Sequence, residues 1–201
     1  MALQNVQLCL ALWFIVATFF TSSCVGNPIR DDIDKCVKEA KTLLDIVTAT
    51  LNLEGIYEGF NCSTQGMEYL TRSDTLIACE PNTENCIGCS GHRKTTFNKE
   101  ACIGNITSDL LIYRAELKAY NHDDLTNTLN SIDTLIEDLS LLRMNGSPST
   151  PTTNTDHQAT LENNFSNRQR LCKVLRAFRV RSVTINRVMN YIKLGSTSHV
   201  C

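Results

Sequence analysis

Three residues in the middle of the chain have a spacing that could bind a metal or carry out thiol chemistry. Cys86 and Cys89 are separated by two residues, and His92 follows Cys89 at the same interval. A zinc site needs a fourth ligand, and a redox Cys-x-x-Cys motif usually opens a helix beside a strand. The sequence offers neither context. Disulfide formation is therefore the favoured interpretation, and we expect no metal and no cofactor.

The run His122-Asp123-Asp124 is another group that could act in acid or base catalysis. It lies between two predicted helices, where residues of these types commonly form turns. No nucleophile elbow, phosphate-binding loop or paired-carboxylate motif stands out in the sequence. We therefore expect a protein that acts by binding other proteins and is not an enzyme.

The amino terminus predicts export from the cell. An apolar block from Leu8 to Phe20 is followed by small residues and then by a polar segment, as in a secretory signal peptide. The block is shorter than the roughly 20 residues that a bilayer-spanning helix needs, and no later segment is long and apolar enough. We expect a signal peptide over 1–26, one mature domain over 27–201, a secreted extracellular location and no membrane insertion.

The cysteines and the glycosylation sequons agree with an oxidising extracellular location. Ten cysteines are present, and eight remain once Cys9 and Cys24 leave with the signal peptide. In an exported chain such cysteines form disulfides, although their spacing alone cannot choose among the pairings. Four Asn-x-Ser/Thr sequons predict N-glycosylation at Asn61, Asn105, Asn145 and Asn164.

Apolar residues recur at steps of three and four in four stretches, which is the period of an amphipathic helix. We predict helices at about 31–53, 103–121, 125–143 and 166–194. The second and third are about four residues apart, which makes them antiparallel neighbours. The other connections have about 50 and about 20 residues, and the later one contains a flexible Ser/Thr/Pro-rich linker over 145–160. These lengths predict an all-α, up-up-down-down four-helix bundle of the cytokine kind, with two long crossover connections and disulfides, in preference to a plain up-down bundle.

The fourth predicted helix has two different sides. Its apolar stripe, which runs from Leu171 to Ile192, is expected to face the core. The opposite side carries branched apolar residues, a tyrosine and arginines, a composition typical of binding hot spots. This predicted partner-binding set consists of Arg176, Val180, Val183, Thr184, Arg187 and Tyr191.

The charge of the same segment limits the kind of partner. Eight basic residues and no acidic residue follow Glu162. Nucleic acid or heparin could attract this charge, but no nucleic-acid-binding motif accompanies it, so an acidic pocket on a protein fits better. A long loop of the chain itself could also cover this side of the helix, and the sequence leaves that alternative open.

Two segments resemble a known family. LCKVLRAFRVRSVTINRVMNY, residues 171–191, resembles the last helix of the interleukin-12 alpha subunit family, and CSGHRKTTFNKEAC, residues 89–102, resembles the cysteine-bounded segment before its second helix. The resemblance implies a secreted cytokine subunit that pairs with the receptor-like beta subunit of interleukin-12, and possible pairing with a second beta-type subunit. It also implies signalling through lymphocyte cytokine receptor chains, with T-cell and NK-cell activation and induction of interferon-gamma. In that family an arginine at the position of Arg187 enters a pocket of the beta subunit.

The resemblance also implies a set of disulfides. Its intrachain pairs are Cys36–Cys89, Cys62–Cys172 and Cys79–Cys102. Cys86 resembles the cysteine that links the family to its beta subunit, but only two residues separate it from Cys89, where the family has a longer loop. Cys201 therefore competes for the interchain bond, and Cys86 and Cys201 could also pair with each other.

Two other classes of function compete with a cytokine subunit. A secreted carrier would hold a small apolar ligand inside the bundle, and no polar group on the core stripes supports such a pocket. A secreted enzyme is disfavoured because catalytic motifs are missing. We therefore expect protein partners, with no nucleic acid among them.

Overall fold

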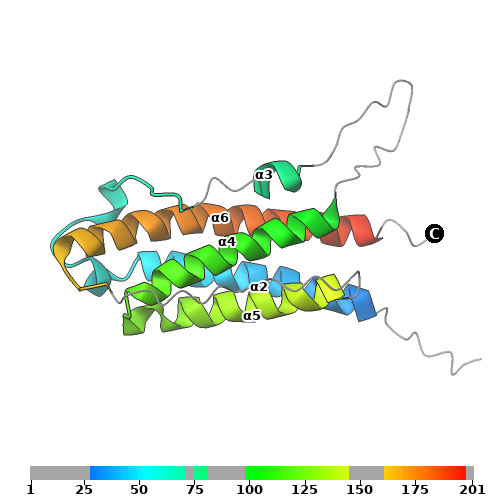
Figure 1. The fold of residues 1–201 in the computed structure, drawn as a ribbon, viewed down its shortest axis with the longest axis horizontal. Helices are drawn as coiled ribbons and strands as arrows, with labels where there is room; N and C mark the ends of the chain where they lie inside the picture. The colour runs from blue at the N-terminus through cyan, green and yellow to red at the C-terminus, as the bar shows by residue number, and fades with distance from the viewer. Residues whose placement is uncertain (1–27, 71–74, 81–97, 145–160, 198–201) are drawn as a thin grey trace, which may run out of the picture.

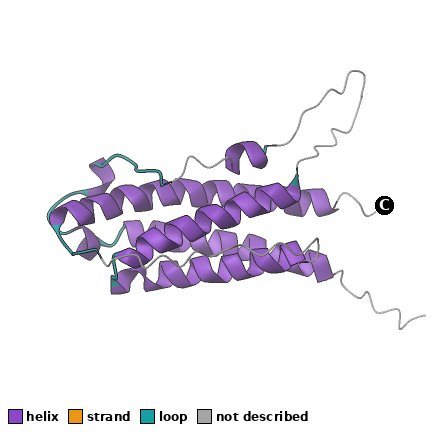
Figure 2. Cartoon of the chain, viewed as in Figure 1, coloured by secondary structure: helices purple, strands orange, loops and turns teal. Residues whose placement is uncertain are grey.

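The computed structural model describes residues 28–70, 75–80, 98–144 and 161–197, and within these ranges it contains helices, turns and loops but no strand (Figures 1 and 2). The long helices are α2 (Pro28–Leu51), α4 (Lys99–Ala119), α5 (Thr126–Met144) and α6 (Phe165–Thr197). The short elements are η1 (Glu54–Tyr57), η2 (Cys62–Thr64), α3 (Thr75–Ala78) and η3 (Asp123–Leu125). The prediction of an all-α bundle is confirmed.

The helix directions give the topology. In Figure 1, α2 and α4 run one way along the bundle, and α5 and α6 run the other way. The segment between α4 and α5 is short, which makes these two helices antiparallel neighbours. α2 ends at one end of the bundle and α4 begins at the other, so their connection spans its length. The predicted up-up-down-down arrangement is therefore observed.

The turn between α4 and α5 is fixed by two residues. Asn121 has a φ of 46°, a left-handed conformation that Asn adopts more readily than most residues. The Nδ1 atom of His122 accepts a hydrogen bond from the backbone N–H of Asp124 at 3.3 Å and caps η3. The His122-Asp123-Asp124 run thus serves turn geometry.

The observed helix ends differ from the expected ones by a few residues. α4 begins at Lys99, earlier than expected, because the Asn98 side chain accepts a hydrogen bond from the Ala101 backbone N–H at 3.0 Å and caps the helix there. α6 was expected to end at about residue 194, but it passes through Gly195 and continues to Thr197. A single glycine costs a helix only about 1 kcal/mol relative to alanine, so it does not force an end.

The core lies between the four long helices. α2 packs against both α5 and α6. The inward stripe predicted for the last helix is buried at Leu171, Leu175, Phe178, Ser182, Ile185, Met189 and Ile192. At its centre the Phe178 ring stacks on Tyr113 of α4, with 4.6 Å between the ring centroids. An aromatic pair of this kind stabilises the core beyond its buried area alone.

A buried ion pair joins α6 to α4. The Nε atom of Arg181 lies 3.2 Å from Oδ2 of Asp109, and the two side chains are 8% and 1% exposed. The hydroxyl of Thr75 in α3 donates to the same carboxylate oxygen at 2.8 Å. One carboxylate therefore connects three elements.

Two disulfides attach the connection between α2 and α4 to the long helices. Cys62 of η2 is bonded to Cys172 of α6. Cys79, next to α3, is bonded to Cys102 of α4. Both bonds join cysteines that the family resemblance paired.

Cys36 of α2 is a buried free thiol in the described part of the chain. Burial, and secondarily the nearby Asp138 carboxylate, raise the pKa of this thiol to about 12. Because the thiolate is the reactive form, Cys36 is inert at neutral pH in this state. Its expected partner Cys89 lies outside the described residues, so the Cys36–Cys89 bond stays a prediction.

Removing the two observed disulfides should destabilise the chain unequally. The bonded cysteines are 110 residues apart in one case and 23 in the other. The entropy that a cross-link removes from the unfolded chain grows with loop length, so we expect losses of about 5 kcal/mol for Cys62→Ala/Cys172→Ala and about 3 kcal/mol for Cys79→Ala/Cys102→Ala. Urea unfolding followed by circular dichroism measures both. An equal or larger loss for the shorter loop would contradict this expectation.

Removing one member of the buried ion pair should also be costly. Asp109→Ala leaves the Arg181 guanidinium buried without its counter-ion, and we expect the free energy of unfolding to fall by about 3–5 kcal/mol. The double variant Asp109→Leu/Arg181→Met removes both charges and should recover much of this loss. Thermal unfolding of the two variants provides the comparison, and equal instability would show that the unpaired charge is not the cause.

Candidate partner-binding face

The side of α6 that faces away from the core presents apolar and charged side chains to solvent. Val180 is 40% exposed and Tyr191 is 60% exposed. Arg187 is exposed between them, and Val183 and Thr184 are half-buried. Residues three, four and seven positions apart share one side of a helix. These five residues therefore form one surface, which we call the outer face of α6.

The basic side chains of α6 fall into two groups. The helix contains no acidic residue of its own. Three of its basic side chains pair with carboxylates of other elements: Arg170 with Glu116, Arg181 with Asp109 and Lys193 with Asp34. Arg187 belongs to the other group, together with Arg176 and Arg179: no carboxylate within the described ranges pairs with it, and its side chain is exposed. Its guanidinium is therefore available to a carboxylate of another molecule.

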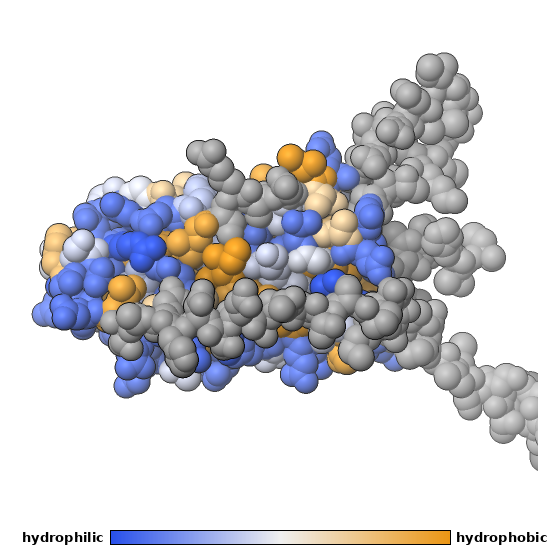
Figure 3. Space-filling model, viewed as in Figure 1, coloured by the Kyte–Doolittle hydropathy of each residue, from blue (hydrophilic) through white to orange (hydrophobic). Residues whose placement is uncertain are grey.

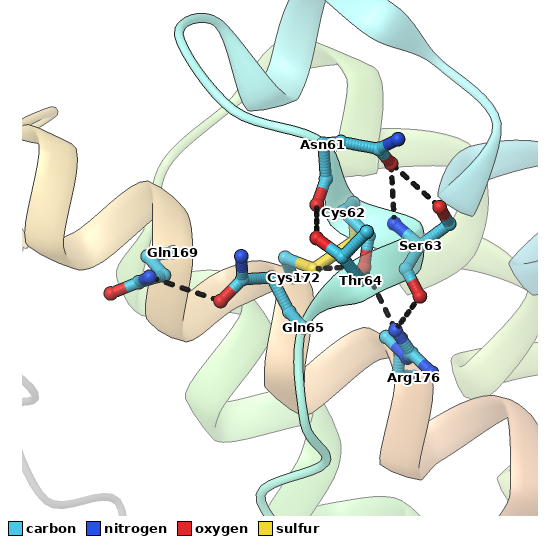
Figure 4. Close-up of a disulfide and its surroundings, with 8 residues drawn as sticks. All are labelled: Asn61, Cys62, Ser63, Thr64, Gln65, Gln169, Cys172 and Arg176. Carbon is cyan, nitrogen blue, oxygen red and sulfur yellow. Dashed lines mark hydrogen bonds between the residues drawn. A yellow bond between two sulfur atoms is a disulfide. The ribbon is translucent and has the colours of Figure 1, made fainter.

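The crossover that follows α2 contacts α6 between Gln169 and Arg176 (Figure 4). The side-chain amide of Gln169 donates to Oε1 of Gln65 at 3.0 Å. The backbone N–H of Glu68 donates to the carbonyl of Lys173 at 3.1 Å. A loop of the chain thus covers this side of the helix near its beginning, as the alternative interpretation proposed. On the outer face, Val180, Arg187 and Tyr191 are exposed, and no loop among the described residues covers them.

Arg176 is placed differently from the rest of the predicted set. Its Nη1 atom donates to the carbonyls of Cys62 at 2.9 Å and Ser63 at 2.5 Å (Figure 4). The guanidinium therefore holds η2 against α6. Arg176 lies at the boundary between the covered half of the helix and its outer face.

A groove of about 540 Å³ adjoins the outer face at Val180. Its walls are the end of α2, the segment around η2 and α6. Among the residues that the structure describes, its lining contains two arginines and no carboxylate. We call it the crossover groove. Its large apolar and basic lining residues are Leu51, Met67, Arg176, Arg179 and Val180.

A second groove, of about 660 Å³, lies between α2 and the α5 side of the bundle. Its charged residues are Glu39, Asp123 and Asp124, and no basic side chain of the described part of the chain lines it. Most of the remaining lining is threonine, asparagine and serine. We call it the acidic groove. α2 therefore contributes to two surface grooves of opposite charge.

Apolar side chains are also exposed on α3 and α4. Figure 3 shows hydrophobic patches over both elements on the face in view. Leu76 and Ile77 of α3 are 63% and 73% exposed, and Ile112 of α4 is 41% exposed. α3 is followed closely by residues outside the described ranges, so we assign no partner to these patches.

The sequons differ in accessibility. Asn61 and Asn164 are exposed. Asn105 is half-buried, and its Nδ2 atom, where a glycan would be attached, donates to the Ala101 carbonyl at 2.9 Å. Asn145 lies outside the described residues. The structure therefore favours Asn61 and Asn164 as acceptors, because N-glycans need surface positions.

Several predicted features fall outside the described residues, namely Cys86, Cys89, His92, Cys201 and the linker at 145–160. Among the residues that are described, no three or more His, Cys, Asp or Glu side chains form a group that could hold a metal ion. In the same part of the chain, no helix has the length and apolar character needed to cross a membrane.

The sequence did not identify Arg179 as part of a functional surface. This residue is exposed, and its Nε atom donates to the hydroxyl of Thr48 in α2 at 3.2 Å. The contact depends on how α6 packs across α2, and periodicity within one helix does not give that packing angle. The available signal was the pair of arginines at 176 and 179 next to Val180.

Comparisons with known proteins agree with the fold. A family model described as "Interleukin-12 alpha subunit" matches residues 24–195. The chain is 29% identical to interleukin-12 subunit alpha of Marmota monax over 197 residues, which cover 83% of this chain and 86% of that protein. It is 29% identical to the Rattus norvegicus protein over 192 residues, with 79% and 84% covered. The Mus musculus protein is 27% identical over 202 residues, with 84% and 86% covered. Since the family match extends over most of its length, this chain belongs to the interleukin-12 alpha subunit family.

Proposed function

We propose that this chain is a secreted subunit of a heterodimeric cytokine and that the outer face of α6 docks onto a receptor-like beta subunit. The observation that carries the proposal is the exposed Arg187, which has no carboxylate partner among the described residues and lies between Val180 and Tyr191. The relatives named interleukin-12 subunit alpha support the same assignment.

The outer face has the composition of an interface centre. Arginine and tyrosine are enriched among residues that dominate binding energy, and surrounding apolar groups exclude water from them. The Arg187 fork can donate two parallel hydrogen bonds to one carboxylate. Val180 and Tyr191 would cover that contact on either side. A partner with an acidic pocket bordered by apolar or aromatic groups therefore fits this surface.

Few cysteines remain available to form a disulfide with such a partner. Four cysteines form the two observed disulfides, and Cys36 is buried. If Cys36 pairs with Cys89, as the family resemblance implies, Cys86 and Cys201 are left for an interchain bond. Cys86 is our first choice, because it resembles the cysteine that links the family to its beta subunit.

Membership of the interleukin-12 alpha subunit family supports a route of secretion, pairing and signalling for this chain. The signal peptide at 1–26 directs the chain to the secretory pathway, where it is glycosylated and paired with the beta subunit of interleukin-12. The heterodimer then engages cytokine receptor chains on lymphocytes, activates T cells and NK cells and induces interferon-gamma. Pairing with a second beta-type subunit is a further part of the proposal.

A carrier of a small apolar ligand is the alternative function. Such a protein needs an apolar cavity inside the bundle. The two grooves described above lie at the surface, and charged and polar side chains line much of both. They favour contact with protein over enclosure of an apolar molecule.

Arg187→Ala should weaken assembly with the beta subunit by about 30-fold or more, because truncating a hot-spot residue costs about 2 kcal/mol or more. Arg187→Lys should support assembly only poorly, since lysine lacks the planar guanidinium that binds a carboxylate through two hydrogen bonds. Both chains are co-expressed and the secreted heterodimer is quantified. Folding should be unchanged by circular dichroism, because the side chain is exposed. Lys118→Ala, at an exposed position of α4, is the matched control. Normal assembly of Arg187→Ala would refute the assignment.

Cys86→Ser should abolish the covalent heterodimer on non-reducing electrophoresis while the non-covalent complex still forms. The reason is that the interchain bond follows docking and does not replace it. Cys201→Ser is the parallel variant and should leave the covalent band intact. Loss of that band with Cys201→Ser and its persistence with Cys86→Ser would reverse the assignment of the two cysteines.

A further inference from the structure

We propose that the crossover groove is a second subsite for the beta subunit, and that it receives an acidic side chain with an apolar neighbour. This inference rests on the proposed function, since it specifies what the same partner places beside the outer face of α6. It adds Arg179 and the end of α2 to the docking surface.

The groove is continuous with the outer face. Val180 belongs to both, and its side chain is 40% exposed. Arg179 precedes Arg187 by eight residues, which corresponds to about 12 Å along the helix axis. A single protein surface of ordinary interface size covers both arginines. One partner can therefore occupy the groove and contact Arg187 at the same time.

The charge of the groove selects an anionic group. Arg176 and Arg179 line it together, and no carboxylate of the described residues lines it with them. Each guanidinium has five N–H donors. Arg176 uses Nη1 for the carbonyls of Cys62 and Ser63, and Arg179 uses Nε for Thr48. Donors remain on both side chains for a carboxylate that enters the groove.

The two arginines are held in place before a partner arrives. Their hydrogen bonds fix one guanidinium against η2 and the other against α2. The Cys62–Cys172 disulfide fixes the wall that η2 provides to α6. Side chains that are already ordered lose little rotamer entropy on binding. The groove is therefore a preorganised site and not a pair of free surface cations.

The apolar part of the lining favours a protein over a free anion. Leu51 is half-buried, Met67 is 48% exposed and Val180 lies beside them in the groove. A sulfated polysaccharide would use the arginines but not this apolar wall. In the view of Figure 4, Asn61 lies on the other side of η2 from Arg176.

The test uses heterodimers in which Cys86→Ser and Cys201→Ser remove the covalent link, so that non-covalent contacts alone hold the chains together. Dissociation after dilution is followed by size-exclusion chromatography at low and high salt. We expect Arg179→Glu to raise the dissociation constant by about tenfold or more and to weaken its salt dependence, because an interfacial charge pair is lost. Lys118→Glu makes the same charge change on an exposed site of α4 and should alter the constant by less than about twofold.

A second variant guards against a folding artefact. Met67→Glu places a like charge beside the expected carboxylate from an exposed position, and it should weaken assembly in the same way. Circular dichroism establishes that each variant is folded.

The outcomes separate this inference from the proposed function. If Arg187→Ala weakens the heterodimer and both groove variants assemble like the wild type, the groove proposal is overturned and the proposed function stands. If none of the three variants changes assembly, both are overturned. Heparin binding by the full chain that Arg179→Glu abolishes, with assembly unchanged, would assign the groove to an anionic polysaccharide and also overturn the proposal.

Discussion

The attachment of the α2–α4 crossover to α6 determines how much of that helix the chain covers with its own residues. The Cys62–Cys172 bond places η2 against the first half of α6, and Arg176 reinforces this contact through two backbone carbonyls. Beyond this point the outer face from Val180 to Tyr191 is exposed. A crossover without this anchor could lie along more of the helix and compete with a partner. The disulfide thus stabilises the fold and also limits how much of the α6 surface the crossover covers.

The absence of acidic residues in α6 explains why its basic side chains divide by position. Burying an unpaired charge is costly, so a cation that faces the bundle needs a carboxylate from a neighbouring element. Asp109 of α4 meets this need for Arg181, whereas the pair of Asp34 with Lys193 lies at the surface. Arg187 faces solvent, where hydration stabilises its charge until another molecule replaces the water. The intramolecular pairs therefore leave Arg187 on the outer face, and Arg176 and Arg179 in the crossover groove, as the cations of this helix that can recognise an anion.

Sequence periodicity predicted the four long helices and the buried stripe of α6, because residue spacing alone determines which side of a helix is apolar. Connection lengths predicted the topology for a similar reason. The sequence did not predict side-chain contacts between elements that are distant along the chain. The position of Arg176 depends on the path of the crossover, and the contact of Arg179 with Thr48 depends on helix packing. The disulfide pairs came from family resemblance, since cysteine spacing cannot select one pairing.

The two grooves beside α2 carry opposite charges, so the surface of the bundle is electrostatically asymmetric. The crossover groove carries Arg176 and Arg179, whereas Glu39, Asp123 and Asp124 line the acidic groove. A partner with an acidic surface is attracted to the first and repelled by the second, so fewer encounter orientations compete with the productive one. Repulsion of wrong arrangements contributes to specificity as much as attraction does. The net charge of −2 conceals this polarity. The arrangement of charge around α2, and not its sum, therefore governs which side of the molecule an acidic partner approaches.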